Sequence, residues 1–520
     1  MTRRLSVLLG LWCGVALAQT AALTGTVTNA LDSTPIAGVR VTLSGSNASQ
    51  TVLTDGGGKF VFGGVPVGRY FLSAERTGYL GSREQGQRGD TASVSVEAKG
   101  KPSPVTMRLT PSATLTGRVT DEAGLPMPNP NVQVIRRVVS NGRGRLIAVG
   151  QTRGDDIGAF RVPGLAAGRY LVCVEANASS YQRHHSLTYT TTCFPDVTDV
   201  SSAQWLNLGS GEERILEFHV TPVHGVRVSG SVPNAGKGTA ISIRRMDPPG
   251  FPRSSWQPVV WDEKTSSFEI LAVSPGDYLI TAGMYGASGP NLRAMRTILV
   301  GPEDVRDVRL MLKDGPYLSG TVRMGEVPAS GQNQVSVGFD SDNRLMSIYA
   351  NASGSFKQAI TDPGDYSVVV LPPAGWSLQT ITQGGINIRD RKIPIGADAE
   401  PEPIEIVLEQ GGGGTIEVSV QKVLSKVNAP VKLMLLRRLP GENEWAPQGQ
   451  QTIASSAGAL SLHNIPSGEY SLFAWPTAIE FEYLNPEVLE KYRSFGQTVT
   501  VRESETTRVT VAPIPIEKSP

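Results

Sequence analysis

The sequence contains few of the residues from which metal sites and catalytic sites are built. It has three cysteines and five histidines among 520 residues. It has no His-Glu-x-x-His helix, no Gly-x-Ser-x-Gly elbow and no glycine-rich phosphate loop that leads into a helix. We therefore expect no bound metal, no cofactor and no enzymatic activity.

An excess of charge of one sign is also missing. The chain has 48 basic and 47 acidic residues, a net charge of +1, and no strongly basic or acidic block. Proteins that bind nucleic acid or anionic membranes usually carry such a block. The charge pattern therefore gives no indication of either partner.

Long apolar runs are missing beyond the N-terminus. Arg3 and Arg4 near the start of the chain are followed by the apolar stretch Leu5–Ala18, which ends with Ala16-Leu17-Ala18. This order is typical of a secretory signal peptide that is cleaved after Ala18. The alternative, a membrane anchor, would need about 20 apolar residues. We expect residues 1–18 to be a signal peptide and the mature chain, residues 19–520, to have no transmembrane segment. It would then be extracytoplasmic, in the periplasm, on the cell surface or secreted.

Two cysteines remain in the mature chain, Cys173 and Cys193. In an oxidising compartment, a pair so close in sequence favours a disulfide over two free thiols. A zinc site needs three or four ligands, and His184 and His185 are adjacent rather than at ligand spacing. The sequence therefore predicts a disulfide and no metal site.

One pattern of residues occurs five times. The stretch GKFVFGGVPVGRYFLSA at 58–74 has counterparts that start at Gly158, Ser266, Gly354 and Gly458. In each copy a large apolar residue stands ten places before a tyrosine, and a glycine stands two places before the same tyrosine. The glycine and tyrosine pairs are Gly68 and Tyr70, Gly168 and Tyr170, Gly276 and Tyr278, Gly364 and Tyr366, and Gly468 and Tyr470. Recurrence about every 100 residues is too long for a solenoid repeat and fits a small globular domain.

Each copy is interpreted as two strands and the corner that joins them. Tyr70, Leu72 and Ala74 alternate along a strand and share one face. The preceding glycines and proline predict a reversal. A tyrosine just after such a corner is typical of the tyrosine corner of Greek-key sandwiches, and the glycine permits a positive φ or a close approach. Because these residues recur in every copy, whereas a catalytic site normally arises once, we expect them to be structural.

Opening strands such as LTGTVT and closing strands such as VTMRLT delimit the copies. The predicted domains are 19–110, 111–222, 223–314, 315–410 and 411–520. The predicted fold class is all-β, a tandem array of about five transthyretin-like or immunoglobulin-like Greek-key β-sandwiches after a cleaved signal peptide. Gly411–Gly414 is interpreted as a linker, because a strand follows it.

Two segments are not shared between the copies. The second copy carries a long insertion, residues 176–205, that is rich in tyrosine and histidine. The fifth carries a helix signal, with Asn485 as the N-cap, Pro486 at the first helical position and Gly496 as the stop. Recognition usually resides in such segments on a rigid scaffold.

The combination of LTGTVT, AGVRVTL and DGGGKFVFGGVPVGRYFLSA resembles the carboxypeptidase regulatory-like domain, a transthyretin-like (prealbumin-like) sandwich of seven strands. The resemblance covers residues 20–110 and 111–222 and continues in the later copies through the Phe…Gly-x-Tyr signature. It implies a non-catalytic accessory module of secreted bacterial proteins, found beside metallocarboxypeptidases and at the front of some outer-membrane receptors. Starch-binding domains have a related fold.

No zinc peptidase site accompanies that resemblance. The enzyme would hold zinc with a His-x-x-Glu pair and a distant histidine, and all five histidines lack a glutamate three places later. The carboxylate pairs Asp121-Glu122 and Asp155-Asp156 lie in predicted turns, where solvated acids are more common than catalytic or calcium-binding ones.

Three functions remain open from the sequence. The favoured one is a structural or interaction protein of the bacterial envelope, in which five sandwiches form a semi-rigid rod that presents loops to a protein partner. The second is a polysaccharide-binding protein that uses exposed aromatic side chains, with Trp376, expected in a loop, and Trp256 as candidates. The third is an enzyme of unfamiliar design, for which no acid, base, nucleophile or metal grouping can be named.

Overall fold

The computed structural model describes residues 20–515, with gaps. The gaps are 46–48, 81–90, 98–103, 141, 177–186, 248–250, 253–256, 285–291, 325–333, 342–344, 374–375, 390, 398–399, 412, 422–430, 439–444, 454–458 and 478–480. The predicted signal peptide, Trp256, His184 and His185 therefore lie outside the described residues. We refer to the five predicted domain ranges as units 1 to 5.

The fold is all-β, as predicted, and each unit contains two sheets. We call the sheet that holds the first strand of a unit its opening sheet. In each opening sheet the first strand pairs antiparallel with the strand before the corner and parallel with a closing strand. We call the sheet that holds the corner tyrosine the corner sheet.

The opening sheets contain these strands in spatial order: β4 (Lys59–Pro66), β1 (Thr20–Asn29) and β7 (Val105–Leu109) in unit 1; β11 (Ala159–Leu165), β8 (Ala113–Thr120) and β16 (Glu213–His219) in unit 2; β20 (Val259–Asp262), β21 (Ser267–Val273), β18 (Val226–Ser231) and β24 (Val305–Arg309) in unit 3; β29 (Ser355–Ala359), β26 (Tyr317–Arg323), β34 (Ile404–Gln410), β31 (Trp376–Gln383) and β32 (Ile386–Asn387) in unit 4; β38 (Ala459–Ile465), β35 (Gly414–Val420) and β41 (Thr506–Val511) in unit 5.

The corner sheets contain these strands in spatial order: β3 (Ser49–Leu53), β2 (Arg40–Gly45), β5 (Gly68–Glu75) and β6 (Thr91–Val96) in unit 1; β10 (Arg143–Arg153), β9 (Asn131–Ser140), β12 (Gly168–Glu175) and β14 (Thr192–Cys193) in unit 2; β19 (Thr239–Arg245), β22 (Gly276–Met284), β23 (Leu292–Val300) and β25 (Lys313–Asp314) in unit 3; β28 (Leu345–Tyr349), β27 (Ser336–Asp340), β30 (Gly364–Leu371) and β33 (Lys392–Ile395) in unit 4; β37 (Trp445–Ile453), β36 (Val431–Arg438), β39 (Gly468–Pro476) and β40 (Gln497–Val501) in unit 5. In addition, β15 (Leu206–Leu208) pairs with β12, and β13 (Leu187–Tyr189) pairs with β17 (Pro222–His224).

A glycine and a buried phenylalanine face each other in four of the opening sheets. Their registers pair Gly25 with Phe60, Gly117 with Phe160, Gly230 with Phe268, and Gly320 with Phe356. A Cβ at each glycine would meet the phenylalanine ring at 2.3–2.8 Å and a carbonyl oxygen of the closing strand at 1.9–2.4 Å. In unit 5 the pair is Val418 and Leu460. Val418 is larger than the glycine of the other units and Leu460 is smaller than their phenylalanine, so the core stays filled. This exchange explains the loss of the glycine from the fifth copy.

A short helix lies in unit 5, where the sequence predicts one. It spans α1 (Pro486–Tyr492), the side chain of Asn485 accepts a hydrogen bond from the backbone N–H of Glu487, and a 3₁₀ turn, η3 (Arg493–Phe495), leads to Gly496. A second 3₁₀ turn, η2 (Val200–Ser202), lies in unit 2. No helix among the described residues is long and apolar enough to cross a membrane.

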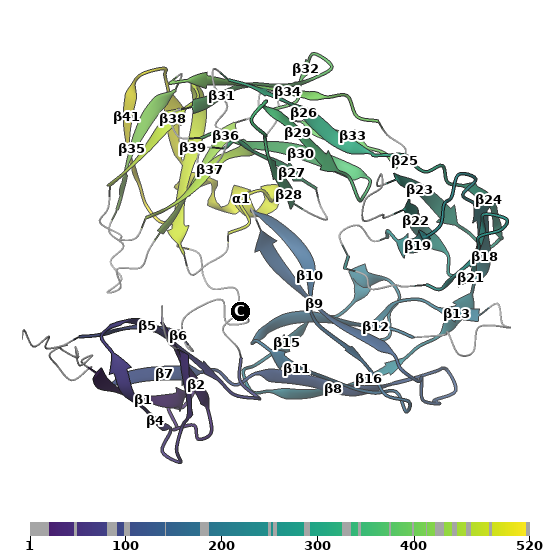
Figure 1. Cartoon of the computed structure of the whole chain (residues 1–520), viewed down its shortest axis with the longest axis horizontal. Helices are drawn as coiled ribbons and strands as arrows, with labels where there is room; N and C mark the ends of the chain where they lie inside the picture. Colours follow the sequence, from purple (N-terminus) through teal and green to yellow (C-terminus); the bar gives the residue numbers. More distant parts are fainter. Residues whose placement is uncertain are drawn as a thin grey trace, which may run out of the picture.

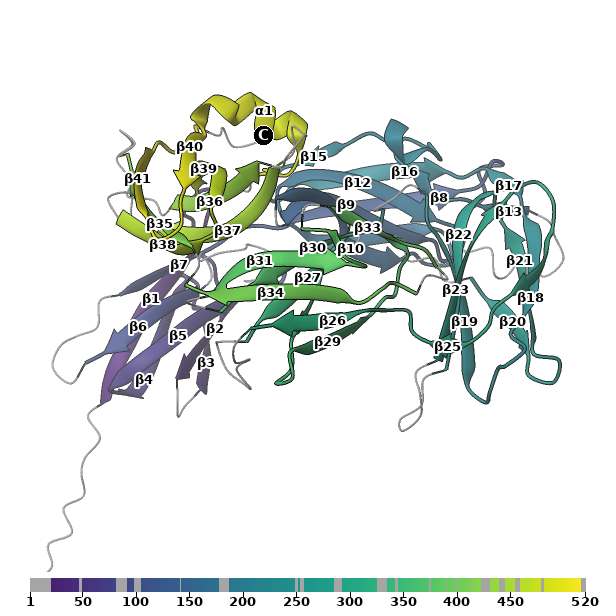
Figure 2. The same ribbon diagram turned by 90° about the horizontal axis from the view of Figure 1, so that it is seen from above.

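The sequence predicts a semi-rigid rod and leaves open whether it is straight, and in the structure the units do not lie in a straight line. Figure 1 shows units 2 to 5 following a curve, with strands β9 and β10 reaching across its middle toward α1. In Figure 2, seen from above, β10 again lies beside β27 and β30 of unit 4. Unit 1 stands outside this curve and joins unit 2 through backbone hydrogen bonds that include Ser112 N–H to Gly78 O. The long-range contacts of β9 and β10 bend the array of units. No pattern in the sequence indicates these contacts.

Candidate functional site: the outer faces of the corner sheets

The corner tyrosines fix the turn that leads into each corner sheet. Four of the hydroxyls donate a hydrogen bond to the carbonyl oxygen four residues earlier: Tyr70 to Pro66 at 3.0 Å, Tyr170 to Ala166 at 2.6 Å, Tyr366 to Asp362 at 2.6 Å, and Tyr470 to Pro466 at 2.6 Å. Tyr278 instead shares a hydrogen bond of 2.9 Å with the hydroxyl of Ser274. The corner glycines Gly276, Gly364 and Gly468 have positive φ, which a residue with a side chain rarely adopts. The tyrosines are buried, and with the glycines they position the sheets.

An arginine lies opposite the corner tyrosine in three units. The Arg136 guanidinium lies 5.9 Å from the centre of the Tyr170 ring, and the strand registers place Arg245 opposite Tyr278 and Arg437 opposite Tyr470. In unit 1 this place is taken by Gly45, where a Cβ would meet the Tyr70 ring at 2.6 Å. Arg245 and Arg437 lie at or next to the end of their strands and Arg136 lies within β9, and no sequence periodicity singled them out.

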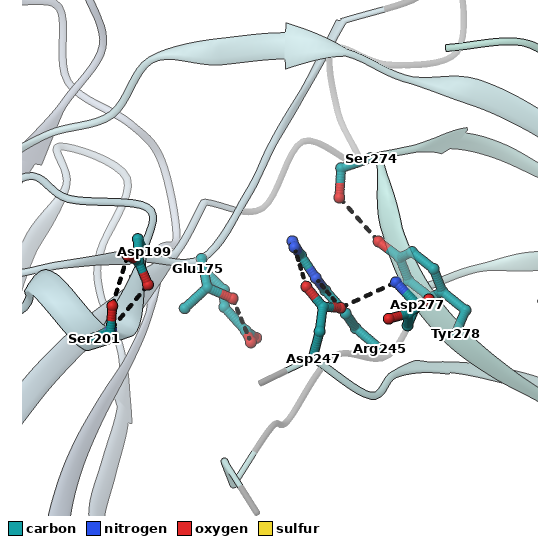
Figure 3. A network of polar contacts seen from close by, with 9 residues as sticks. Glu175, Asp199, Ser201, Arg245, Asp247, Ser274, Asp277 and Tyr278 are labelled. Atoms are coloured by element: carbon teal, nitrogen blue, oxygen red, sulfur yellow. Dashed lines mark hydrogen bonds and ion pairs between the residues drawn. The ribbon is translucent and has the colours of Figure 1, made fainter. Parts of the chain in front are cut away.

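Figure 3 shows the polar contacts around Tyr278. Arg245 donates two hydrogen bonds to Asp247, from Nε to Oδ1 at 2.8 Å and from an Nη to Oδ2 at 2.7 Å. Asp247 also accepts the backbone N–H of Asp277 at 3.1 Å. Burial acts to raise the pKa of Asp247, but the hydrogen bonds and charge of Arg245 outweigh it, so this pKa lies below its usual value. The hydrogen bonds to Asp247 hold the pKa of Arg245 above its usual value. This pair is charged at neutral pH and braces the corner.

Side chains on each corner sheet alternate, so the residue after the corner tyrosine points to the outer face. These residues are Phe71, Leu171, Leu279, Ser367 and Ser471. The outer faces are where the units differ, because different segments cover them.

In unit 2 the disulfide segment covers this face. Cys173 on β12 and Cys193 on β14, the two cysteines expected to pair, form a disulfide. Leu171, Ile135 and both cysteines are buried in one apolar cluster, against which Val197, Val200, Ala203 and Trp205 pack. Phe251 of unit 3 belongs to the same cluster. The insertion in unit 2 is therefore in part a cover for its own sheet and in part a contact with the next unit.

In unit 3 the face is covered by unit 4. Leu279 and Met295 from the outer face of unit 3 belong to the hydrophobic cluster of unit 4. Beside them, Arg244 of β19 forms an ion pair with Asp362 of unit 4. An apolar anchor with an ion pair beside it thus marks this junction, and two exposed ion pairs, Lys313–Glu400 and Asp314–Lys357, also join the two units.

In unit 4 the face is covered by the hairpin β9–β10 of unit 2. Asp340 points outward at the end of β27 and forms an ion pair with Arg145 of β10. The side chains of Arg145 and Asp340 are only 11% and 7% exposed. Arg143 Nε lies 3.6 Å from the other carboxylate oxygen of Asp340. Two arginines of one strand therefore converge on one buried carboxylate.

The tip of the same hairpin contacts unit 5. Glu482 accepts hydrogen bonds from Arg137 at 2.7 Å and from the backbone N–H of Gly144 at 2.8 Å. The Leu484 N–H donates to Gly142 O at 2.8 Å. Gly142 has a φ of 76°, and a Cβ there would meet the Tyr483 ring at 2.3 Å. The hairpin therefore holds units 4 and 5 at once, and we call these contacts with Asp340, Glu482 and Tyr483 the clasp.

The segment around α1 covers the outer face in unit 5. Phe473 and Trp475 of β39 are buried with Phe481, Tyr483 and Leu489. The Trp475 and Phe481 ring centres are 5.2 Å apart. A cavity of about 520 Å³ remains between α1 and β39–β40, lined by Glu469, Glu487, Glu490, Arg493 and Phe473 among others. Its charged groups are exposed, and Arg493 is paired with Glu490 at 3.3 Å.

Two of the tryptophans, Trp376 and Trp261, pack against domain cores. Trp376 does not lie in an exposed loop: it begins β31, pairs with Gln410 across the sheet, and its partly buried side chain packs on the core of unit 4. Trp261 is likewise packed against the core of unit 3. Strand β31 begins directly after the Pro-Pro-Ala-Gly stretch, and this places the Trp376 side chain against the core. The residues before Trp376 did not indicate that a strand begins there.

The predicted turn carboxylates act within their turns. Asp121 Oδ1 accepts the backbone N–H groups of Ala123 and Leu125, and Asp155 Oδ1 accepts those of Ile157 and Ala159. Within the part of the chain that the structure describes, no group of three or more His, Cys, Asp or Glu could hold a metal ion. The carboxylates thus have structural partners.

Residues 22–110 match the family model of the carboxypeptidase regulatory-like domain, which confirms the predicted resemblance for unit 1. That domain is a non-catalytic fold. No curated protein matches the sequence.

Three solved structures with weak similarity are the TIE protein of Bacillus anthracis, the minor pilin GBS52 of Streptococcus agalactiae and the shaft pilin SpaA of Lactobacillus rhamnosus GG. Their identities are 11%, 15% and 12%, and their TM-scores 0.15, 0.22 and 0.21. The matches cover 74%, 39% and 39% of this chain and 68%, 97% and 98% of those chains. The fold and the site therefore define an all-β chain of sandwich units, the first of which matches the carboxypeptidase regulatory-like domain.

Proposed function

We propose that this chain is a non-catalytic structural or interaction protein of the bacterial envelope that works outside the cytoplasm. The observation that supports this most is the clasp, in which Arg145 and Asp340 form a nearly buried ion pair between units 2 and 4. A pair that is so dehydrated is costly unless its geometry is maintained, so it restricts the units to one arrangement. The chain would then be a preformed scaffold that holds loops at fixed distances.

The disulfide agrees with the proposed location, because disulfides persist mainly in oxidising compartments. The proposed partner is a protein of the envelope or the extracellular space. Polysaccharide is the alternative partner, but its first candidate, Trp376, is partly buried against the core.

Binding of purified residues 19–520 to envelopes isolated from the producing cells tests this function. We expect saturable binding that disappears when the envelopes are first treated with protease and the protease is then removed. Envelopes stripped of polysaccharide by glycosidases should bind as before. Binding that survives protease but not the glycosidases would replace the protein partner with a polysaccharide, and no saturable binding to either envelope would contradict the proposed function.

A further inference from the structure

Around the position after the corner tyrosine, protein covers the outer face of the corner sheet in units 2 to 5, whereas this position is open in unit 1. At the position after the corner tyrosine, Leu171 is 2% and Leu279 is 1% exposed, because the disulfide segment and unit 4 cover them. The clasp covers Asp340 in unit 4, and the α1 segment covers Phe473 in unit 5. Phe71, at the same position in unit 1, is 66% exposed.

The face around Phe71 carries mainly hydroxyl side chains, and Leu53, which is 66% exposed, lies at its edge opposite Arg40. The register places Ser44 and Ser93 on either side of Phe71. The next row contains Thr42, Ser73 and Thr91, and the hydroxyls of Thr42 and Thr51 lie 3.1 Å apart. Arg40 and Arg69 are exposed, at one end of β2 and on β5 two residues before Phe71. Glu75 is the acid on this face, and it lies opposite Arg40.

The junction of units 3 and 4 shows how such a face is filled. There, too, an apolar residue follows the corner tyrosine, and the hydroxyls of Ser242 and Thr281 lie 2.7 Å apart beside it. The occupant is another sandwich, which surrounds Leu279 with apolar side chains and gives Asp362 to Arg244. An apolar anchor surrounded by polar groups is also the usual plan of an interface between separate proteins.

We propose that the outer face of β3-β2-β5-β6 in unit 1 is the docking surface for the protein partner, and that the partner supplies an apolar pocket for Phe71 and a carboxylate for Arg69 or Arg40. The inference rests on the proposed function and adds where the partner binds and what it presents. A second copy of this chain is a poor occupant, because two such faces would bring their exposed arginines together, and like charges in contact oppose association.

Photo-crosslinking from position 71 in the producing cells tests this surface. The full chain carries p-benzoylphenylalanine in place of Phe71, and a control chain carries it in place of Leu299, which is 74% exposed on unit 3. Arg69→Glu is added to the position-71 chain as a test of the carboxylate. Arg108→Glu, on the opposite sheet of unit 1, is the matched control.

We expect one protein adduct from position 71, none from position 299, and a crosslinked peptide with an Asp or Glu within a few residues. Arg69→Glu should lower the adduct about tenfold, because a like charge would face the partner, while Arg108→Glu should not. An adduct with a glycan or a second copy, an equal yield from position 299, or no effect of Arg69→Glu would overturn the inference. If position 71 gives no adduct while the chain still binds envelopes saturably, the docking surface is wrong and the proposed function stands.

Discussion

Arg145 of β10 and Asp340 of β27 are 195 residues apart in the sequence and form an ion pair whose side chains are nearly buried. This pair joins units 2 and 4 directly, although unit 3 lies between them in the chain. It therefore closes units 2 to 4 into one arrangement, and the contact of the same hairpin with Glu482 adds unit 5.

Removing one partner of the Arg145–Asp340 pair should strongly destabilise the closed arrangement. Arg145→Ala leaves a buried carboxylate without its main partner, and we expect a loss of about 3–5 kcal/mol from the urea transition that includes units 2 and 4. Adding Asp340→Asn should cost less than the sum of the two single changes. Arg161→Ala, which removes an exposed ion pair with Glu213, should change the unfolding free energy by less than about 1 kcal/mol. Equal effects of Arg145→Ala and Arg161→Ala on the free energy of unfolding would show that the clasp does not stabilise the closed arrangement.

Gly142→Ala should release the hairpin tip from unit 5. The methyl group would meet the buried Tyr483 ring, and alanine also disfavours the positive φ of this residue. Gly164→Ala is the matched control, since Gly164 has a φ of 80° but nothing within 4 Å of its Cβ position. Hydrogen exchange of the Leu484 N–H, which donates to Gly142, measures the release. Faster exchange in Gly142→Ala alone is the expected result, and unchanged exchange would argue against docking of the tip.

Loss of the disulfide should uncover the outer face of unit 2. Its two cysteines are 20 residues apart, and closing such a loop stabilises a domain by about 3 kcal/mol in the chain-entropy model. We expect Cys173→Ala with Cys193→Ala to lower the midpoint of thermal unfolding and to shift Trp205 fluorescence toward that of a hydrated indole. A reducing agent should do the same to the wild type and nothing further to the double variant. An unchanged midpoint would show that packing of Leu171 and Trp205 holds the segment without the bond.

The Asp247–Arg245 pair should make the stability of unit 3 depend on acidic pH. Because the pKa of Asp247 is lowered by folding from an ordinary value of 3.8, the charged carboxylate favours the folded state at any pH above that value. This contribution disappears as the pH falls through the lower, folded-state pKa. Between about pH 5 and pH 2, the wild type should therefore lose more stability than Asp247→Asn, and the two curves should converge. Parallel curves in urea unfolding across this range would contradict the charged pair.

Local features of the sequence were enough to predict the repeated fold. Period-two alternation after each corner, the buried tyrosines and the α1 cap all depend on residues within a few places of each other. The missing glycine of the fifth copy is compensated across the opening sheet, since Val418 faces Leu460.

The candidate site could not be predicted in the same way, because its contacts join distant parts of the chain. The dipeptide Asn141-Gly142 was a hairpin signal in the sequence, since Asn-Gly favours a tight two-residue turn. In the structure, strands of ten and eleven residues flank it. That signal would have shown a long hairpin, but nothing near it indicates Asp340 or Glu482 as its partners. The exposure of Phe71 was hidden for the same reason: its counterparts are covered by segments from elsewhere, and only the structure shows which face lacks a cover.

Small-angle X-ray scattering of residues 19–520 tests the closed arrangement most directly. If β9 and β10 clasp units 4 and 5 in solution, the wild type should scatter as the compact curve of Figure 1, and Arg145→Ala combined with Gly142→Ala should scatter as a longer particle. A wild-type profile of an extended rod, unchanged in the double variant, would contradict the clasp and the scaffold built on it.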